Sequence, residues 1–207
     1  MPTRIDMSTY ARRAHFEYFL NLGYPYVGNT VEVDATPLYA KAKECDESFF
    51  VHALYALGRA ANDVKELRQR IEGNGILQFD HCLCSHTEMK ADGTYAYCET
   101  DPGLAWDVFY PKTQEARARA RENGNIEEGS EALGKFFMSC APWVHFTALV
   151  QPVPFPADSN PRITWGKFVQ KEGRIILTVS ILAHHGLVDG MHIGQFYEAL
   201  EARMREK

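Results

Sequence analysis

The sequence predicts an α/β fold, a two-layer α+β sandwich in which helices pack on one side of a mixed sheet. Residues 175–182 are apolar and rich in β-branched side chains, which is typical of a buried strand. Directly afterwards, Ile193, Phe196 and Leu200 recur at helical spacing. Strand-like and helical segments follow one another along the chain without a shift in composition, so we expect a single domain over residues 1–207.

The first third of the chain is expected to be mainly helical. Residues 8–22 carry apolar side chains at four-residue spacing, and residues 48–62 are apolar around most of the helix circumference, which predicts a buried helix. Residues 24–34 have the tyrosines and β-branched residues of a strand, with an interruption at 28–29. Thr36-Pro37 indicates the start of another helix, with the threonine as N-cap.

The rest of the chain is expected to be richer in strands. Asp92-Gly93 is a typical hairpin turn, and Pro142 indicates a bend after an apolar strand. The expected elements are a helical turn at 66–71, strands at 76–82 and 94–99, a charged helix at 111–122 with Arg117 pointing outward, a strand from 136, an extended connector at 152–161, and a hairpin of 163–170 with 175–182.

Composition excludes several classes of function. A net charge of −5 without a long basic run argues against nucleic-acid binding. The first ten residues lack the apolar core of a signal peptide, and no apolar stretch approaches the ~20 residues that cross a bilayer. Five cysteines do not form a disulfide framework, which favours the cytoplasm. The spacing Cys82-Leu83-Cys84 does not fit a zinc site, and we expect no metal.

Two histidines, His184 and His185, follow the buried strand at the point where a helix is about to begin. Ligand chemistry is often found at strand ends in α/β proteins, and imidazole titrates near neutral pH. A histidine beside an apolar strand is also commonly a hydrogen-bonded core residue, and Asp189 is most simply a helix N-cap. If the strand stays regular, His185 belongs to its more apolar face, where desolvation favours the neutral ring.

The pattern His-His-x-x-x-Asp-Gly resembles the signature of the chloramphenicol acetyltransferase family and of the related catalytic domains of dihydrolipoamide acyltransferases. Two further patterns resemble the same family and occur in the same order: Arg-x-x-His-Phe-Glu at Arg12–Glu17, and Ser-x-x-Pro-Trp at Ser139–Trp143. The resemblance covers essentially the whole chain. It implies the acetyltransferase fold, assembled as a homotrimer, with active sites at the interfaces between subunits.

The resemblance also implies a role for six residues. His185 is the general base, and Ser139 is the donor that stabilises the transition state. Thr164 falls on the threonine that positions a water near the transition state. Asp189 pairs with Arg12, which ties the first helix to the catalytic loop. His184 has a structural role.

The acyl donor implied is acetyl-CoA, and the acceptor is a small molecule. Trp143 and Lys167 are expected at the CoA slot; Tyr18, Phe19, Tyr95 and Phe136 are expected at the acceptor. Chloramphenicol is the leading acceptor, which implies antibiotic resistance, although the order Tyr18-Phe19 and the polar Gln151 depart from the family pattern. The alternatives are another small alcohol or amine as acceptor, a lipoyl-linked acyltransferase core, and a non-catalytic relative that binds a small molecule.

Overall fold

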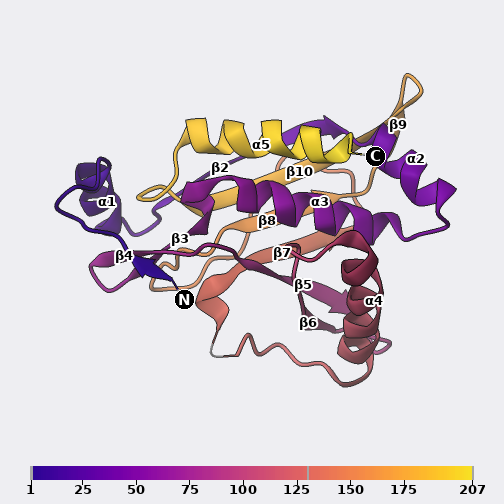
Figure 1. Cartoon of the computed structure of the whole chain (residues 1–207), viewed down its shortest axis with the longest axis horizontal. Helices are drawn as coiled ribbons and strands as arrows, with labels where there is room; N and C mark the ends of the chain where they lie inside the picture. Colours follow the sequence, from indigo (N-terminus) through magenta and orange to yellow (C-terminus); the bar gives the residue numbers. More distant parts are fainter. Residues whose placement is uncertain (1, 130, 207) are drawn as a thin grey trace.

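The computed structural model describes residues 2–129 and 131–206, and its main element is a seven-stranded mixed sheet (Figure 1). β7 is parallel to both of its neighbours, β5 and β8, whereas the other pairs in this sheet are antiparallel. The order across the sheet is β2 (Tyr26–Asp34), β10 (Arg174–His184), β8 (Arg162–Gly166), β7 (Lys135–Ala141), β5 (Leu83–Met89) and β6 (Tyr95–Thr100), with β9 (Val169–Lys171) paired to β10.

Helices cover one face of this sheet and bury the core against it. Figure 1 shows α3 (Phe49–Asp63) and α5 (Gly190–Met204) running together across the sheet, with α4 (Trp106–Asn123) beside β6. The strand residues that face them are apolar, for example Val179 and Ile181, and both are almost fully buried. α3 is apolar on most sides because it packs against the sheet and against neighbouring helices at once.

The opposite face of the sheet carries no helix in the described part of the chain. Because side chains alternate along a strand, Ser139, Thr164 and Ser180 lie in register on this face. The irregular segment 142–161 lies over it, and its contacts with the strands include the hydroxyl of Tyr26, which donates to the Asp158 carbonyl at 3.1 Å. This face is therefore more polar than the core face.

The remaining elements lie around the main sheet. In the described residues they are α1 (Arg13–Leu20), α2 (Thr36–Glu44), two 3₁₀ turns (Lys65–Arg68 and Ala132–Gly134), and a second sheet of β1 (Thr3–Arg4), β4 (Gly75–Gln78) and β3 (Gln69–Glu72). Figure 1 shows α1 at one end of the molecule and α2 at the other. None of the described helices is long and apolar enough to span a bilayer.

The structure corrects two predictions near the N-terminus. The first helix begins at Arg13 rather than residue 8, because Asp6 accepts hydrogen bonds from the backbone and hydroxyl of Ser8 and holds a turn there. The strand predicted to break at 28–29 is continuous. Gly28 is inside it because a Cβ at this position would collide with the carbonyl oxygen of Ile181.

The fourth helix is also longer than predicted. It begins at Trp106 and contains Pro111 in its interior, although proline cannot donate the helical hydrogen bond. The extra turn is held by aromatic packing, since Trp106 and Phe109 lie 5.1 and 4.6 Å from the ring of Tyr55. Burial of these rings offsets the missing donor.

The strands before residue 100 differ in their bounds. The strand predicted at 76–82 ends at Gln78, and a separate strand, Leu83–Met89, was not predicted. The turn predicted at 66–71 is a 3₁₀ turn followed by β3. The hairpin at Asp92-Gly93 is confirmed: Gly93 has φ = 82°, a conformation that glycine adopts without strain.

Candidate active site

The junction between β10 and α5 places the two histidines. The strand ends at His184, and the chain turns so that α5 begins at Gly190 with Asp189 as its N-cap. The carboxylate of Asp189 accepts from the backbone N–H of Met191 at 3.0 Å. The ring of His192 in turn accepts from the backbone N–H of Asp189 at 3.1 Å, which completes a capping box and fixes the loop.

The ring of His185 is held on two sides. Its Nδ1 lies 2.8 Å from the carbonyl oxygen of Val188, which can only accept a hydrogen bond. In the neutral ring the proton is therefore on Nδ1, and Nε2 keeps a lone pair. Phe19 stacks on the ring with a centroid distance of 4.0 Å and an interplanar angle of 22°. This arrangement fixes the tautomer that a general base needs.

His184 is the more deeply buried of the pair, contrary to the parity argument, because β10 ends before His185. Burial lowers the pKa of His184 to about 4. Its Nδ1 accepts from the backbone N–H of Gly186 at 3.1 Å. These contacts are those of a structural histidine that stays neutral.

An ion pair joins this loop to the first helix. A guanidinium nitrogen of Arg12 contacts the carboxylate of Asp189, and the other terminal nitrogen donates to the carbonyl of His185 at 3.2 Å. Although partial burial opposes it, the positive charge of Arg12 and the hydrogen bond from the Met191 backbone N–H hold the pKa of Asp189 below its usual value. The structure thus brings together residues that are 177 positions apart and anchors the backbone of His185.

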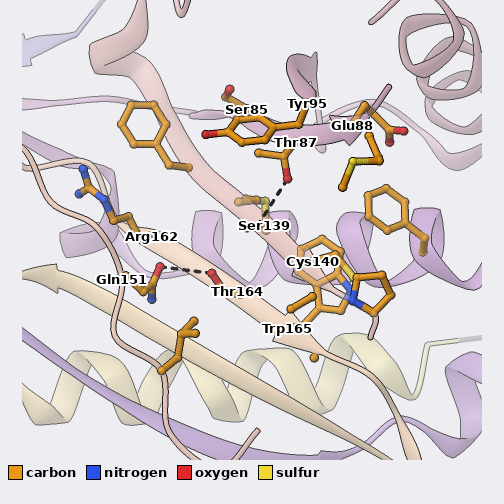
Figure 2. Close-up of a pocket in the computed structure, with 18 of the residues that line it drawn as sticks. Ser85, Thr87, Glu88, Tyr95, Ser139, Cys140, Gln151, Arg162, Thr164 and Trp165 are labelled. Atoms are coloured by element: carbon orange, nitrogen blue, oxygen red, sulfur yellow. Dashed lines mark hydrogen bonds between the residues drawn. The ribbon is translucent and has the colours of Figure 1, made fainter. Parts of the chain in front are cut away.

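A cavity of about 930 Å³ opens at the carboxyl ends of the parallel strands β5, β7 and β8. Ser139 and Thr164 lie side by side on β7 and β8 at its wall (Figure 2). The Ser139 hydroxyl is 3.5 Å from that of Thr87, and the Thr164 hydroxyl donates to Oε1 of Gln151 at 3.2 Å. The cavity therefore combines an apolar lining with a short row of hydroxyl and amide groups, which is typical of a small-molecule site.

Comparison with known proteins identifies the family. A model of the family described as chloramphenicol acetyltransferase matches residues 2–201. The chain belongs to the chloramphenicol acetyltransferase family. Members of this family are acetyl-CoA-dependent O-acetyltransferases, so the chain is an enzyme of this type. The resemblance found in the sequence motifs is confirmed.

Individual relatives agree with this assignment over almost the full chain. Chloramphenicol acetyltransferase 2 of Haemophilus influenzae is 26% identical over 207 residues, covering 96% of this chain and 95% of the relative. A solved structure of a chloramphenicol acetyltransferase has a TM-score of 0.90 at 27% identity, covering 99% of this chain and all of that chain. A probable dihydrolipoamide acetyltransferase from Listeria monocytogenes shares the fold, with a TM-score of 0.69 at 16% identity and coverage of 98% and 94%.

Within this family fold, the residues expected at the site fall into two groups. Trp143, Lys167 and Tyr95 line the same cavity as Ser139 and Thr164. The second group contains His185, Phe19 and Tyr18, which lie together at the β10–α5 loop and do not line the cavity. One chain therefore presents the histidine on one surface and the hydroxyl groups on another.

The structure corrects the prediction for Phe136. We expected it beside the acceptor, but it is fully buried on the helical face of β7, where the guanidinium of Arg70 lies over its ring at 5.4 Å. The neighbouring residue, Phe137, lines the cavity instead. The reason is strand alternation: Ser139 and Phe137 share one face, and Phe136 belongs to the other.

The structure also reveals a charged cluster at the cavity that sequence reasoning missed. Arg117 was expected to point outward from α4, but it reaches inward to the buried carboxylate of Glu88, and its guanidinium lies 4.4 Å from the ring centroid of Phe50. Burial alone would raise the pKa of Glu88, but the His86 ring, 3.3 Å from its carboxylate, and the hydrogen bond from the charged Arg117 lower it to about 2. The sequence signal for this cluster was Ser85-His86-Thr87-Glu88, whose side chains alternate between the two faces of β5, a strand that was not predicted.

Among residues 2–129 and 131–206, no group of three or more His, Cys, Asp or Glu side chains is arranged to hold a metal ion. Cys84 is buried, and desolvation raises the pKa of its thiol, which is the wrong direction for a thiolate ligand.

Proposed function

We propose that this chain transfers the acetyl group of acetyl-CoA to a hydroxyl of a small acceptor, with chloramphenicol as the leading candidate, and that His185 is the general base. The observation that carries the proposal is the hydrogen bond between Nδ1 of His185 and the Val188 carbonyl, since it leaves Nε2 free to take a proton. Members of the family use acetyl-CoA as co-substrate.

The chemistry follows from these groups. Nε2 of His185 removes the proton of the acceptor hydroxyl as its oxygen attacks the thioester carbonyl. The attack forms a C–O bond and a tetrahedral oxyanion, to which Ser139 donates a hydrogen bond. Collapse of this intermediate breaks the C–S bond, and the imidazolium returns the proton to the departing CoA sulfur. Thr164 holds a water or an acceptor group beside the reacting carbon.

We further propose that the complete site needs two copies of the chain in a homotrimer. In support, His185 does not line the cavity that contains Ser139. Exposed apolar side chains also flank both regions: Tyr18 (63% exposed) lies near His185, and Trp143 (68%) and Val150 (95%) lie at the cavity. Two different apolar surfaces on one chain suit a head-to-tail interface, which closes into a ring.

Chloramphenicol is supported by the names of the relatives, all at about a quarter identity. A different small alcohol or amine is the second candidate, because Gln151 adds a buried amide to the cavity wall. Trp143 and Lys167 are proposed at the CoA end of the cavity, Tyr95 at the acceptor end, and Tyr18 and Phe19 beside His185 of the neighbouring copy.

The test is acetyl-CoA consumption by the purified chain with chloramphenicol as first acceptor. We expect CoA release that depends on the acceptor, and we expect His185→Ala to remove nearly all of it while the protein stays folded. Turnover of dihydrolipoamide but not of chloramphenicol would favour the lipoyl-linked alternative. Lack of CoA binding in calorimetry would favour a non-catalytic relative.

A further inference from the structure

A second cavity opens in the helical layer, apart from the cavity that contains Ser139. It has a volume of about 250 Å³ and shares no lining residue with the larger one. Its walls come from α2, α3, α4 and the last turn of α5 with the residue that follows it, and Figure 1 shows α2 beside the marked C-terminus. None of the residues to which we assign a role in acetyl transfer lines it.

One wall of this second cavity is aromatic. The ring of His52 packs against Trp106 with a centroid distance of 4.2 Å, and the ring of Tyr55 lies 5.1 Å from the same indole. His52 is buried, with Nε2 2.8 Å from the carboxylate of Glu47, whereas Trp106 and Tyr55 are only partly buried. The Tyr55 hydroxyl donates to the Leu104 carbonyl at 2.9 Å. The wall therefore offers flat apolar surface, which favours an aromatic ligand.

The charged side chains at the second cavity carry a surplus of positive charge. Among the described residues that line it, Lys41, Arg59 and Arg203 are cationic, and Glu206 alone is anionic. Arg59 pairs with Glu206 at 3.1 Å, and Arg203 pairs with both Glu206 and Asp63. Two guanidinium groups are thus placed around one carboxylate that is 45% exposed.

Lys41 differs from the two arginines because its ammonium group has no partner. It forms no hydrogen bond or ion pair with any residue in the described ranges 2–129 and 131–206, although its side chain is partly buried. Burial lowers the pKa of His52, and the nearby charge of Lys41 acts in the same direction against the effect of Glu47. The ammonium group therefore lies near the aromatic wall and can bind an anion without first leaving a carboxylate.

We propose that the second cavity binds a small aromatic anion, whose carboxylate pairs with Lys41 and whose ring packs on Trp106 and Tyr55. Arg59 adds to this site, because an ion pair as exposed as Arg59–Glu206 contributes little to stability and can be exchanged for the ligand. The volume limits the ligand to about one or two fused rings. The site lies outside the acetyl-transfer chemistry, so this ligand is neither the acceptor nor CoA.

The experiment measures binding of 2-naphthoate to the purified chain by calorimetry, with 2-naphthamide as a neutral ligand of nearly the same shape. We expect the anion to bind more tightly than the amide, by about tenfold, because it alone forms a charged hydrogen bond with Lys41. Its affinity should fall between about 50 mM and about 500 mM NaCl, whereas that of the amide should not. The anion should also raise the Tm, since the site joins four helices that separate on unfolding.

Three lysine variants locate the site. Lys41→Gln should weaken 2-naphthoate binding about tenfold, because it removes the charge and keeps a polar side chain. Lys43→Gln changes an exposed lysine of α2 that lies over the Tyr39 ring, and Lys167→Gln changes an exposed lysine at the larger cavity. Both should bind 2-naphthoate as the wild type does.

Four outcomes would overturn the proposal. Wild-type affinity in Lys41→Gln would remove the ammonium group from the site, and an equal loss in Lys43→Gln would assign the effect to general surface charge. A loss in Lys167→Gln but not in Lys41→Gln would place the ligand in the larger cavity. No binding of 2-naphthoate, or equally tight binding of 2-naphthamide, would exclude an anion site. All of these results are independent of whether the chain acetylates an acceptor.

Discussion

Replacing Arg12 tests whether the start of the first helix holds His185, the proposed general base, in place. Arg12→Ala removes the ion pair with Asp189 and the hydrogen bond to the His185 carbonyl. The two side chains are 18% and 31% exposed, which is between an exposed pair, worth up to ~1 kcal/mol, and a buried one, whose disruption costs about 3–5 kcal/mol. We therefore expect a loss of about 2 kcal/mol in the free energy of unfolding, with roughly a further 1 kcal/mol from the lost hydrogen bond.

The effect on turnover should be larger than the effect on folding. A shift of ~1 Å in a reacting group can cost about 10²-fold in rate, so kcat should fall by about that factor while the KM for acetyl-CoA changes little. The measurements are urea unfolding and steady-state kinetics. Arg13→Ala is the matched control, because Arg13 is 57% exposed and pairs with Glu17 on its own helix. Wild-type kcat and stability in Arg12→Ala would refute the reasoning.

Three further predictions follow from single contacts. Ser139→Ala should lower kcat by about 10²- to 10³-fold without weakening CoA binding in calorimetry, because it removes the proposed oxyanion donor; an unchanged kcat would exclude that role. Gly28→Ala should destabilise the protein by about 2–3 kcal/mol in urea unfolding, because its Cβ meets the Ile181 carbonyl, and wild-type stability would contradict the close approach. Burial lowers the pKa of His184 to about 4 from an unfolded value of ~6.5, so its contribution to stability is complete above about pH 6.5 and is lost as the pH falls toward 4, on the order of 2–3 kcal/mol. Unfolding measured at pH 7 and pH 4.5 should show a smaller difference in His184→Gln, and an equal difference would contradict this assignment.

Much of the fold was predictable because its signals are local. The β10 strand and the α5 helix have strong apolar periodicities, and the structure places both close to their predicted bounds. The errors arose where tertiary contacts decide the outcome. Aromatic packing starts α4 before Pro111, and a close backbone approach makes Gly28 part of a strand. Neither contact has a signature in the surrounding sequence.

The candidate site was likewise predictable in its local motifs and not in its tertiary contacts. The motif carried by Asp189 and Arg12 led to the prediction of two residues that the structure brings into contact. The separation of His185 from the cavity is a property of the whole fold, and only the family resemblance suggested it. The inward direction of Arg117 depends on a buried carboxylate, Glu88, in a strand that was not predicted.

The most direct test of the two-copy active site is subunit complementation. His185→Ala and Ser139→Ala are each expected to be nearly inactive alone. Unfolded together and refolded at a 1:1 ratio, they should regain about a quarter of wild-type turnover, because each interface of a mixed trimer draws its two copies independently. If His185 and Ser139 instead act within one copy, every site keeps one defect, and a mixture that refolds and binds CoA but stays inactive would contradict the proposal.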